Sequence, residues 1–497
     1  MSSFFMLATL FAYFFLLLYI SRRSSRRGAR GNEAFFRAGR QSPWWLVAFG
    51  MIGASISGVT FISVPGWAQA TGMTYLQMCL GFIVGYVIVA FVLLPLYYKW
   101  QLTSIYAWLG ERFGRRTHRT GALFFLLSKL TGAAARLYLV CLVLCQFVVY
   151  PLLGSGWLPF MLTAIGMLFL IWLYTRQSGI QTIVRTDALQ TACLLFAALG
   201  ICVIAAHRLD LGFLDTFRFI AESPQCRMWE FDPASKQAFW RQFLSGIFIV
   251  IVMTGLDQDM MQKNLTCRNL QEAQKDMCVY GLTFLPVNAL FLGLGILLYA
   301  LCAAEGITPP AASDELLPSL VSAGVLGHWV IIPFTIGIVA AAFSSADSAL
   351  TALTTTVCID LLQIERGDLS EASARRIRHR VHLCMVGCFV LCMVLFRLAN
   401  NTSVLDAIYV MASYTYGPLL GLYAYGIFTR RSVTDTFVPF VCLLAPVFCA
   451  ALDYFAPRLW GYTFGYELLL LNGMLTFAGL WITSVRRSSD EALRVAR

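Results

Sequence analysis

Charged side chains are scarce in this sequence. Only 13% of its 497 residues are Asp, Glu, Lys or Arg, whereas soluble proteins carry about a quarter. Hydrophobic residues make up 59% of the chain, and its mean hydropathy is +0.71. Apolar runs long enough to cross a bilayer recur from one end to the other. The composition therefore excludes an ordinary soluble protein and predicts an all-α integral membrane protein.

Motifs for metal and redox chemistry are also missing. The chain has five histidines, no CxxC pair, no HExxH and no Cys–His spacing typical of zinc. Most of its 15 cysteines lie in apolar segments, where a thiol packs as a small hydrophobe. A GxGD-like motif is missing as well, so an intramembrane enzyme that uses Asp187 and Asp347 as paired carboxylates is a remote alternative. We therefore expect that the protein is not an enzyme and that it binds no organic cofactor.

The apolar runs predict about thirteen transmembrane helices. They cover residues 3–20, 44–66, 76–96, 121–150, 156–174, 186–206, 241–262, 277–303, 326–356, 381–398, 404–428, 436–455 and 466–484. About three quarters of the 37 lysines and arginines fall in alternate loops, including 263–276, which predicts a cytoplasmic C-terminus and an outside N-terminus. The net charge of +11 thus reflects topology in the cell membrane, not nucleic-acid binding.

Two predicted spans are interrupted by small and polar residues. GASISGVTF lies within 44–66, and MTGLDQDMMQ lies within 241–262. They are five spans apart, so each opens a block of five spans, and the two blocks have opposite orientations. Interrupted helices at matching positions of inverted halves mark the central site of a transporter. The alternative is that the small residues only let helices pack closely.

This pattern divides the chain into five parts. We predict an extra transmembrane helix and cytoplasmic loop, a first repeat, an extracellular loop with short helices, a second repeat, and two C-terminal helices with a short cytoplasmic tail. Their ranges are 1–40, 41–206, 207–240, 241–430 and 431–497.

The stretch AAAFSSADSALTAL at 340–353 brings polar side chains into an apolar span. A charge at that depth costs about 2.5–3.5 kcal/mol on insertion scales, which makes Asp347 a functional candidate. Carboxylate, hydroxyl and carbonyl oxygens are what an alkali cation needs. In a helix Ser344, Asp347 and Ser348 share one face and Ser345 points about 100° away, which predicts two neighbouring oxygen clusters. Alternatively, the serines bond back to their own helix.

Cations also occur within the spans. Lys129 and Arg136 lie seven residues apart on one helix face. A guanidinium suits capture of a carboxylate, although a buried Asp187 or Asp347 is an alternative partner. We expect Lys129 to extend to the cytoplasmic surface. Asp257 and Asp259, near a span end, are expected to reach water or to cap a helix.

Five motifs together resemble the sodium:solute symporters, which include bacterial carriers of sugars, proline, pantothenate and sialic acid. They are AGRQSPWWLVAFGMIGASISGVTFISVPGWA (38–68), SGIQTIVRTDALQ (178–190), GLDQDMMQK (255–263), FSSADSALTALTTTV (343–357) and SYTYGPLLGLYAYGIFTRR (413–431). The resemblance implies a LeuT-like 5+5 inverted repeat with one helix before it and two after it. It also implies sodium-coupled symport of a small organic solute by alternating access.

The resemblance carries over to oxygen ligands for one or two sodium ions. The residues that match the family's common site are Gly53, Ile56, Ala341, Ser344 and Ser345. Those that match a second site are Asp187, Ser344, Asp347 and Ser348. At Asp347 other members carry a hydroxyl, so the second site departs from the family pattern.

The substrate positions differ from those of the sugar carriers. Their Glu-Gln pair is matched by Val59 and Thr60, and their gating tyrosine by Met253. Arg136 resembles the arginine that holds the carboxylate in sialic acid carriers. The expected substrate-binding residues are Ser55, Ser57, Thr60, Arg136 and Met253. We expect a sugar acid such as sialic acid, with a neutral sugar, an amino acid or another carboxylate as alternatives and a nutrient sensor as a remote one. The partners are the solute and the lipid bilayer, with no nucleic acid, and the protein is expected to act as a monomer.

Overall fold

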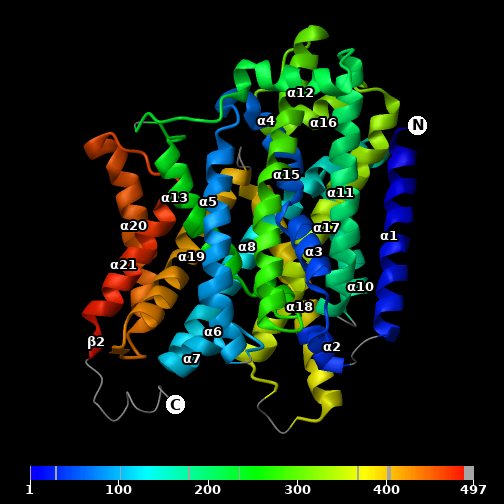
Figure 1. Cartoon of the computed structure of the whole chain (residues 1–497). Coiled ribbons are helices and arrows are strands. Elements are labelled where there is room, and N and C mark those ends of the chain that lie inside the picture. The colour runs from blue at the N-terminus through cyan, green and yellow to red at the C-terminus, as the bar shows by residue number, and fades with distance from the viewer. Residues whose placement is uncertain are drawn as a thin grey trace.

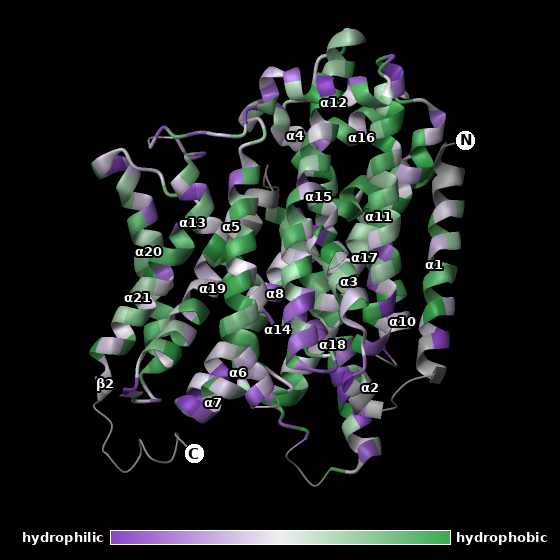
Figure 2. Cartoon of the chain, in the orientation of Figure 1, coloured by the Kyte–Doolittle hydropathy of each residue, from purple (hydrophilic) through white to green (hydrophobic). Residues whose placement is uncertain are grey.

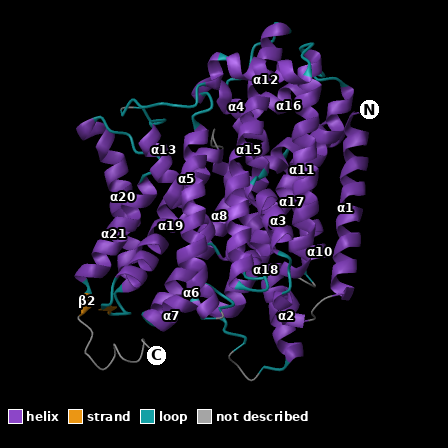
Figure 3. Cartoon of the chain, in the orientation of Figure 1, coloured by secondary structure: helices purple, strands orange, loops and turns teal. Residues whose placement is uncertain are grey.

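Long helices run side by side between two polar ends of the molecule (Figures 1 and 3). The computed structural model describes residues 2–27, 31–100, 102–176, 179–233, 235–365, 369–399 and 404–485. The α-helices of the first half are α1 (Ser2–Arg27), α2 (Gly31–Arg37), α3 (Trp44–Ser55), α4 (Gly58–Thr71), α5 (Tyr75–Ile88), α6 (Leu94–Lys99), α7 (Ala107–Arg112), α8 (Arg115–Leu144), α9 (Tyr150–Leu153), α10 (Trp157–Thr175), α11 (Ile180–Arg208) and α12 (Phe213–Glu222).

The second half continues with α13 (Phe239–Val250), α14 (Gln258–Asn264), α15 (Leu270–Ala304), α16 (Leu316–Ser322), α17 (Ile331–Thr356), α18 (Glu371–Ala399), α19 (Val404–Phe428), α20 (Val438–Trp460) and α21 (Leu468–Ile482). Short π-helical turns extend several helices: η2 (Val89–Leu93), η3 (Cys145–Val149), η5 (Ile251–Gly255) and η8 (Val357–Leu361). Single 3-10 turns are η1 (Ala38–Arg40), η4 (Pro224–Cys226), η6 (Ser313–Glu315) and η7 (His328–Val330). Strands β1 (Ser432–Val433) and β2 (Ser484–Val485) pair antiparallel.

Each predicted span coincides with one helix or with a bent pair of helices. By length and composition, eight helices within the described residues can cross a membrane, and ten if each bent pair counts as one span. The other three predicted spans coincide with α1, α19 and the shorter α21. Bulky apolar side chains are exposed along the helices, for example Leu158 on α10 and Phe196 on α11. Hydrophobic residues thus cover the middle of the bundle and hydrophilic ones its ends (Figure 2), as a bilayer requires.

The two interrupted spans are broken helices. Helices α3 and α4 meet at 63°, and α13 with its π-turn meets α14 at 70°. The chain leaves helical geometry at Ile56 and Ser57 in the first break and at Asp257 in the second. In the views shown, α4 lies above α3 whereas α14 lies below α13 (Figures 1 and 2). The two broken helices therefore run in opposite directions, as expected of an inverted repeat.

Candidate functional site

A cavity of about 110 Å³ lies between the two broken helices. Helices α3 and α4 border one side, α13, η5 and α14 another, and α5, α8, α15 and α19 complete the wall. Four of the five predicted substrate residues line it: Ser55, Thr60, Arg136 and Met253. Ser57 does not line it, because it forms the extended link between α3 and α4 and is buried there.

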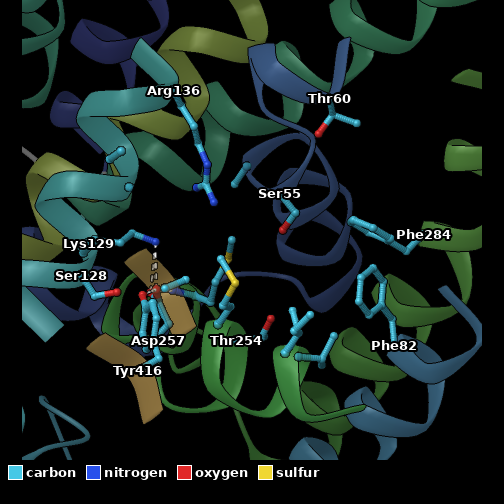
Figure 4. Close-up of a pocket in the computed structure, with 18 of the residues that line it drawn as sticks. Ser55, Thr60, Phe82, Ser128, Lys129, Arg136, Thr254, Asp257, Phe284 and Tyr416 are labelled. Carbon is cyan, nitrogen blue, oxygen red and sulfur yellow. Dashed lines mark hydrogen bonds and ion pairs between the residues drawn. The ribbon is translucent and has the colours of Figure 1, made fainter. Parts of the chain in front are cut away.

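Hydroxyl groups gather on one side of the cavity. The Ser55 hydroxyl is hydrogen-bonded to the phenol of Tyr280 on α15. The Tyr86 phenol donates to that of Tyr280 at 2.9 Å. Thr254 and the rings of Phe82 and Phe284 lie beside them (Figure 4). Such a wall offers hydrogen bonds and apolar faces, the combination that orients a small polar solute. Sequence reasoning missed these aromatic residues, because nothing in the sequence separates them from residues that pack against lipid.

Arg136 extends from α8 into the cavity (Figure 4). No carboxylate among the described residues lies within 4 Å of its guanidinium. The alternative partners considered from the sequence have other contacts: Asp187 pairs with Lys263, and Asp347 accepts from Tyr174. Asp259 interacts with Arg136 electrostatically without contacting it, so the guanidinium is suited to bind a carboxylate on the solute.

The expectation for Lys129 was wrong. Its side chain is buried, not extended to the surface, and its Nζ lies 3.1 Å from Asp257 Oδ2 and 2.7 Å from Asp259 Oδ2. Both carboxylates are almost fully buried, and Asp257 lines the central cavity beside Lys129 (Figure 4). An ammonium in an apolar interior needs paired charges. The two aspartates supply these charges, and the lysine thereby ties α8 to the second broken helix.

Asp257 also explains the second break. Its Oδ1 accepts from the backbone N–H of Asp259 at 2.9 Å and of Met260 at 3.3 Å, so it caps the N-terminus of α14. The Tyr416 phenol donates to its Oδ2 at 2.6 Å. A new helix can start inside the protein here because the carboxylate satisfies its first N–H groups. Helix capping, one of the two readings that the sequence allowed for Asp257, is confirmed.

The predicted first sodium site lies where the end of α3 meets the middle of α17. The Ser345 hydroxyl on α17 lies 3.4 Å from the carbonyl oxygen of Ala54 on α3. Gly53 packs against α11, and a Cβ added there would lie 2.1 Å from Thr191 Oγ1. Ile56 and Ala341 are also almost fully buried. Carbonyls freed by the break and hydroxyls on α17 are thus brought to one interface, with hard oxygens of the type that sodium prefers.

Thr191 belongs to this interface but was missed from the sequence. It accepts from the backbone N–H of Gly53 at 3.0 Å and donates to the carbonyl of Asp187 at 2.8 Å. Thr191 could have been found from its position four residues after Asp187, because that spacing puts both side chains on one helix face.

The four residues predicted for a second cation also lie together. Ser344 Oγ donates to Asp187 Oδ1 at 2.9 Å, and Ser348 Oγ to Oδ2 at 3.4 Å. Asp347 lies on the same helix, buried, and accepts from the Tyr174 phenol at 2.7 Å. No group of three or more His, Cys, Asp or Glu within the described ranges is arranged to hold a metal ion. Any cation here would therefore bind to mixed hydroxyl and carboxylate oxygens.

The family model of the sodium:solute symporter family matches residues 35–435, more than half of the chain. The chain belongs to this family. It is therefore a sodium-coupled transporter rather than an enzyme, which confirms the expectation from the motifs.

Relatives with assigned names agree with this result. The sodium/sialic acid symporter of Aliivibrio fischeri is 26% identical over 441 residues, which cover 85% of this chain and 83% of the relative. The sodium/sialic acid symporter of Proteus mirabilis is 23% identical, with 90% of each chain covered. The human sodium/iodide cotransporter is 25% identical, with 81% of this chain and 62% of the relative covered.

Solved structures agree on the fold. The structure of a Na⁺-coupled sialic acid symporter, in a substrate-bound outward-open state, superposes with a TM-score of 0.81 at 20% identity and covers 98% of this chain and all of its own. The nucleobase–cation symporter Mhp1 gives a TM-score of 0.57 at 13% identity, over 93% of this chain and 94% of its own. The predicted LeuT-like inverted-repeat fold is thereby confirmed.

Proposed function

We propose that this symporter carries an acidic solute, a sugar acid such as sialic acid, together with sodium by alternating access. The observation that carries the proposal is the guanidinium of Arg136, which faces the central cavity without a carboxylate partner within the described chain. A carboxylate on the solute would complete a bidentate pair. The hydroxyls of Ser55, Thr60 and Tyr280 would serve the hydroxyl groups of the sugar.

The relatives described above carry anions according to their names: two carry sialic acid and one carries iodide. This supports an anionic solute. A smaller carboxylate is the second candidate, because the same guanidinium would hold it. A neutral sugar would leave Arg136 unpaired in the occupied cavity, which disfavours it.

Sodium would bind between α3 and α17, with Gly53, Ile56, Ala341, Ser344 and Ser345 as ligands. An ion there bridges the broken helix and α17, which would close the gap between them and steady the cavity wall. The membrane potential would add about 2.3 kcal/mol per 100 mV to the chemical gradient for each net positive charge that enters in one transport cycle. Charge placement supports a cell-membrane location with the N-terminus outside and the C-terminus in the cytoplasm, and we propose a monomer as the working unit.

Uptake into proteoliposomes tests the proposal. An inward sodium gradient should drive accumulation of labelled sialic acid, and replacement of sodium by potassium should abolish it. Galactose, proline, lactate and iodide form the comparison panel. Equal or faster uptake of galactose would overturn the proposal, and preference for lactate or proline would favour the second candidate, a smaller carboxylate.

The matched variants are R136A and R218A. Loss of a bidentate charged pair removes about 1.5–3 kcal/mol of binding free energy, so R136A should raise KM for the acidic solute at least tenfold. Arg218, an exposed residue of α12 whose side chain is 76% accessible, serves as the control. Unchanged KM in R136A would contradict the role of the arginine.

A further inference from the structure

We propose that the ammonium of Lys263 fills the second cation position, so that the protein couples to one sodium ion instead of two. The proposal rests on the proposed sodium coupling and concerns the number of ions. The distribution of charges predicts a cytoplasmic loop over residues 263–276, but Lys263 lies on α14 with 1% of its side chain exposed. A fixed positive charge therefore lies inside the predicted ion-binding region.

Lys263 is aimed at Asp187. Its Nζ lies 2.8 Å from Asp187 Oδ2 and 3.8 Å from Asp259 Oδ1. Asp187 is fully buried on α11, two turns after the start of that helix. The lysine therefore pairs with one of the two carboxylates of the predicted second sodium site.

The remaining contacts of Asp187 are the expected sodium ligands. Ser344 donates to Oδ1, and Ser348 donates to the same Oδ2 that faces Lys263. Both carboxylate oxygens thus have partners already, and the ammonium stands where an incoming cation would stand. A sodium ion at this position would lie against a second unit charge in the protein interior, where repulsion is strong because water does not screen it.

Asp347 is the neighbouring carboxylate. It interacts electrostatically with both Asp187 and Lys263, and its Oδ2 accepts from the Tyr174 phenol at 2.7 Å. Its Oδ1 is buried and has no hydrogen-bond partner within the described residues. A wild-type protein with two sodium ions would use this oxygen. The positive charge that faces Asp187 and Asp347 is therefore either Lys263 alone or Lys263 with a second sodium ion. The measured number of bound ions distinguishes these two arrangements.

The ion count can be measured without transport. For purified protein in detergent, stabilisation against heat rises with the logarithm of sodium concentration, and at saturation the slope is proportional to the number of bound ions. Choline chloride replaces sodium chloride in the titration, so that the ionic strength stays constant. We expect a slope of one ion for wild type and for K263R, which keeps the charge.

Removal of the lysine should create the missing site. K263M leaves Asp187 without its cation. The slope of thermal stabilisation against the logarithm of sodium concentration should therefore double in K263M, from one bound ion to two. The double variant D187N/K263M, which removes both members of the pair, should return to one. A slope of two in wild type, or of one in K263M, would overturn the proposal.

D187N covers the case in which K263M does not fold. It should keep the wild-type slope of one, because the bound ion does not use Asp187, and a fall to zero would contradict the proposal. No sodium-dependent stabilisation in any variant would instead overturn the proposed sodium coupling itself. The two failures are therefore distinguishable.

Transport gives a second readout. One sodium ion with a monovalent anion moves no net charge, whereas two ions move one charge per cycle. Wild-type uptake of the acidic solute should therefore be insensitive to an imposed membrane potential, and uptake by K263M should accelerate with a negative interior. Potential-driven uptake in wild type would contradict the single-ion assignment.

Discussion

The buried pairing of Lys129 provides a direct test of the structure. K129M keeps most of the side-chain volume but removes the ammonium that lies within 3.2 Å of Asp257 and Asp259. Removal of one partner from a buried ion pair costs about 3–5 kcal/mol, because the other charge remains buried. Asp257 keeps the Tyr416 phenol and two backbone N–H groups, and Asp259 keeps Lys263 at 3.8 Å. We therefore expect K129M to lower the free energy of unfolding by about 3 kcal/mol, the lower end of this range.

Thermal unfolding of purified protein measures this loss. At about 2 °C per kcal/mol for a large chain, the melting temperature should fall on the order of 5 °C. K236M is the matched control, because Lys236 is exposed on the outer loop, and it should melt within about 1 °C of wild type. Adding D257N to K129M removes one unpaired charge and should restore part of the loss. Equal melting temperatures for K129M and K236M would refute the buried pairing.

Two further variants test the sodium interface. The double variant S344A/S345A removes two predicted ligand hydroxyls and should abolish sodium-dependent uptake in proteoliposomes. The control T163A, whose hydroxyl donates to the Pro159 carbonyl of its own helix, should keep sodium-dependent uptake. Retained sodium dependence in S344A/S345A would contradict the site. G53A adds a Cβ that would lie 2.1 Å from Thr191 Oγ1, so it should lower stability by about 1–3 kcal/mol and weaken sodium-dependent uptake. G166A, where nothing lies within 4 Å of the added Cβ, is its control, and equal melting of the two variants would show that the contact is not tight.

Much of the fold was predictable because the bilayer imposes a simple length rule. A helix that spans hydrocarbon needs about twenty apolar residues, so the spans could be read from composition alone. The two breaks were predictable as well, since Gly53 and Gly58 in one span and Asp257 in the other are unfavourable in a helix interior. The order of the motifs then indicated the family, and the match over residues 35–435 confirms it.

The charges were harder to predict, because their partners are far away in sequence. Asp187 and Lys263 are brought together by α11 and α14, and Lys129 meets Asp257 across 128 positions. A lysine beside a polar loop is usually solvated, so sequence reasoning counted Lys263 as a surface charge. Only the path of α14, which returns into the bundle after the break, buries it.

The sequence by itself thus determined the membrane spans, the two breaks, the residues with sodium-type oxygens and the family, because each depends on local composition or on linear motifs. The tertiary structure alone decided which charges neutralise one another: it left Arg136 facing the cavity and gave Lys263 to Asp187. The physical reason is that a buried charge is stable only beside a counter-charge, and the packing of distant helices determines which counter-charge is near.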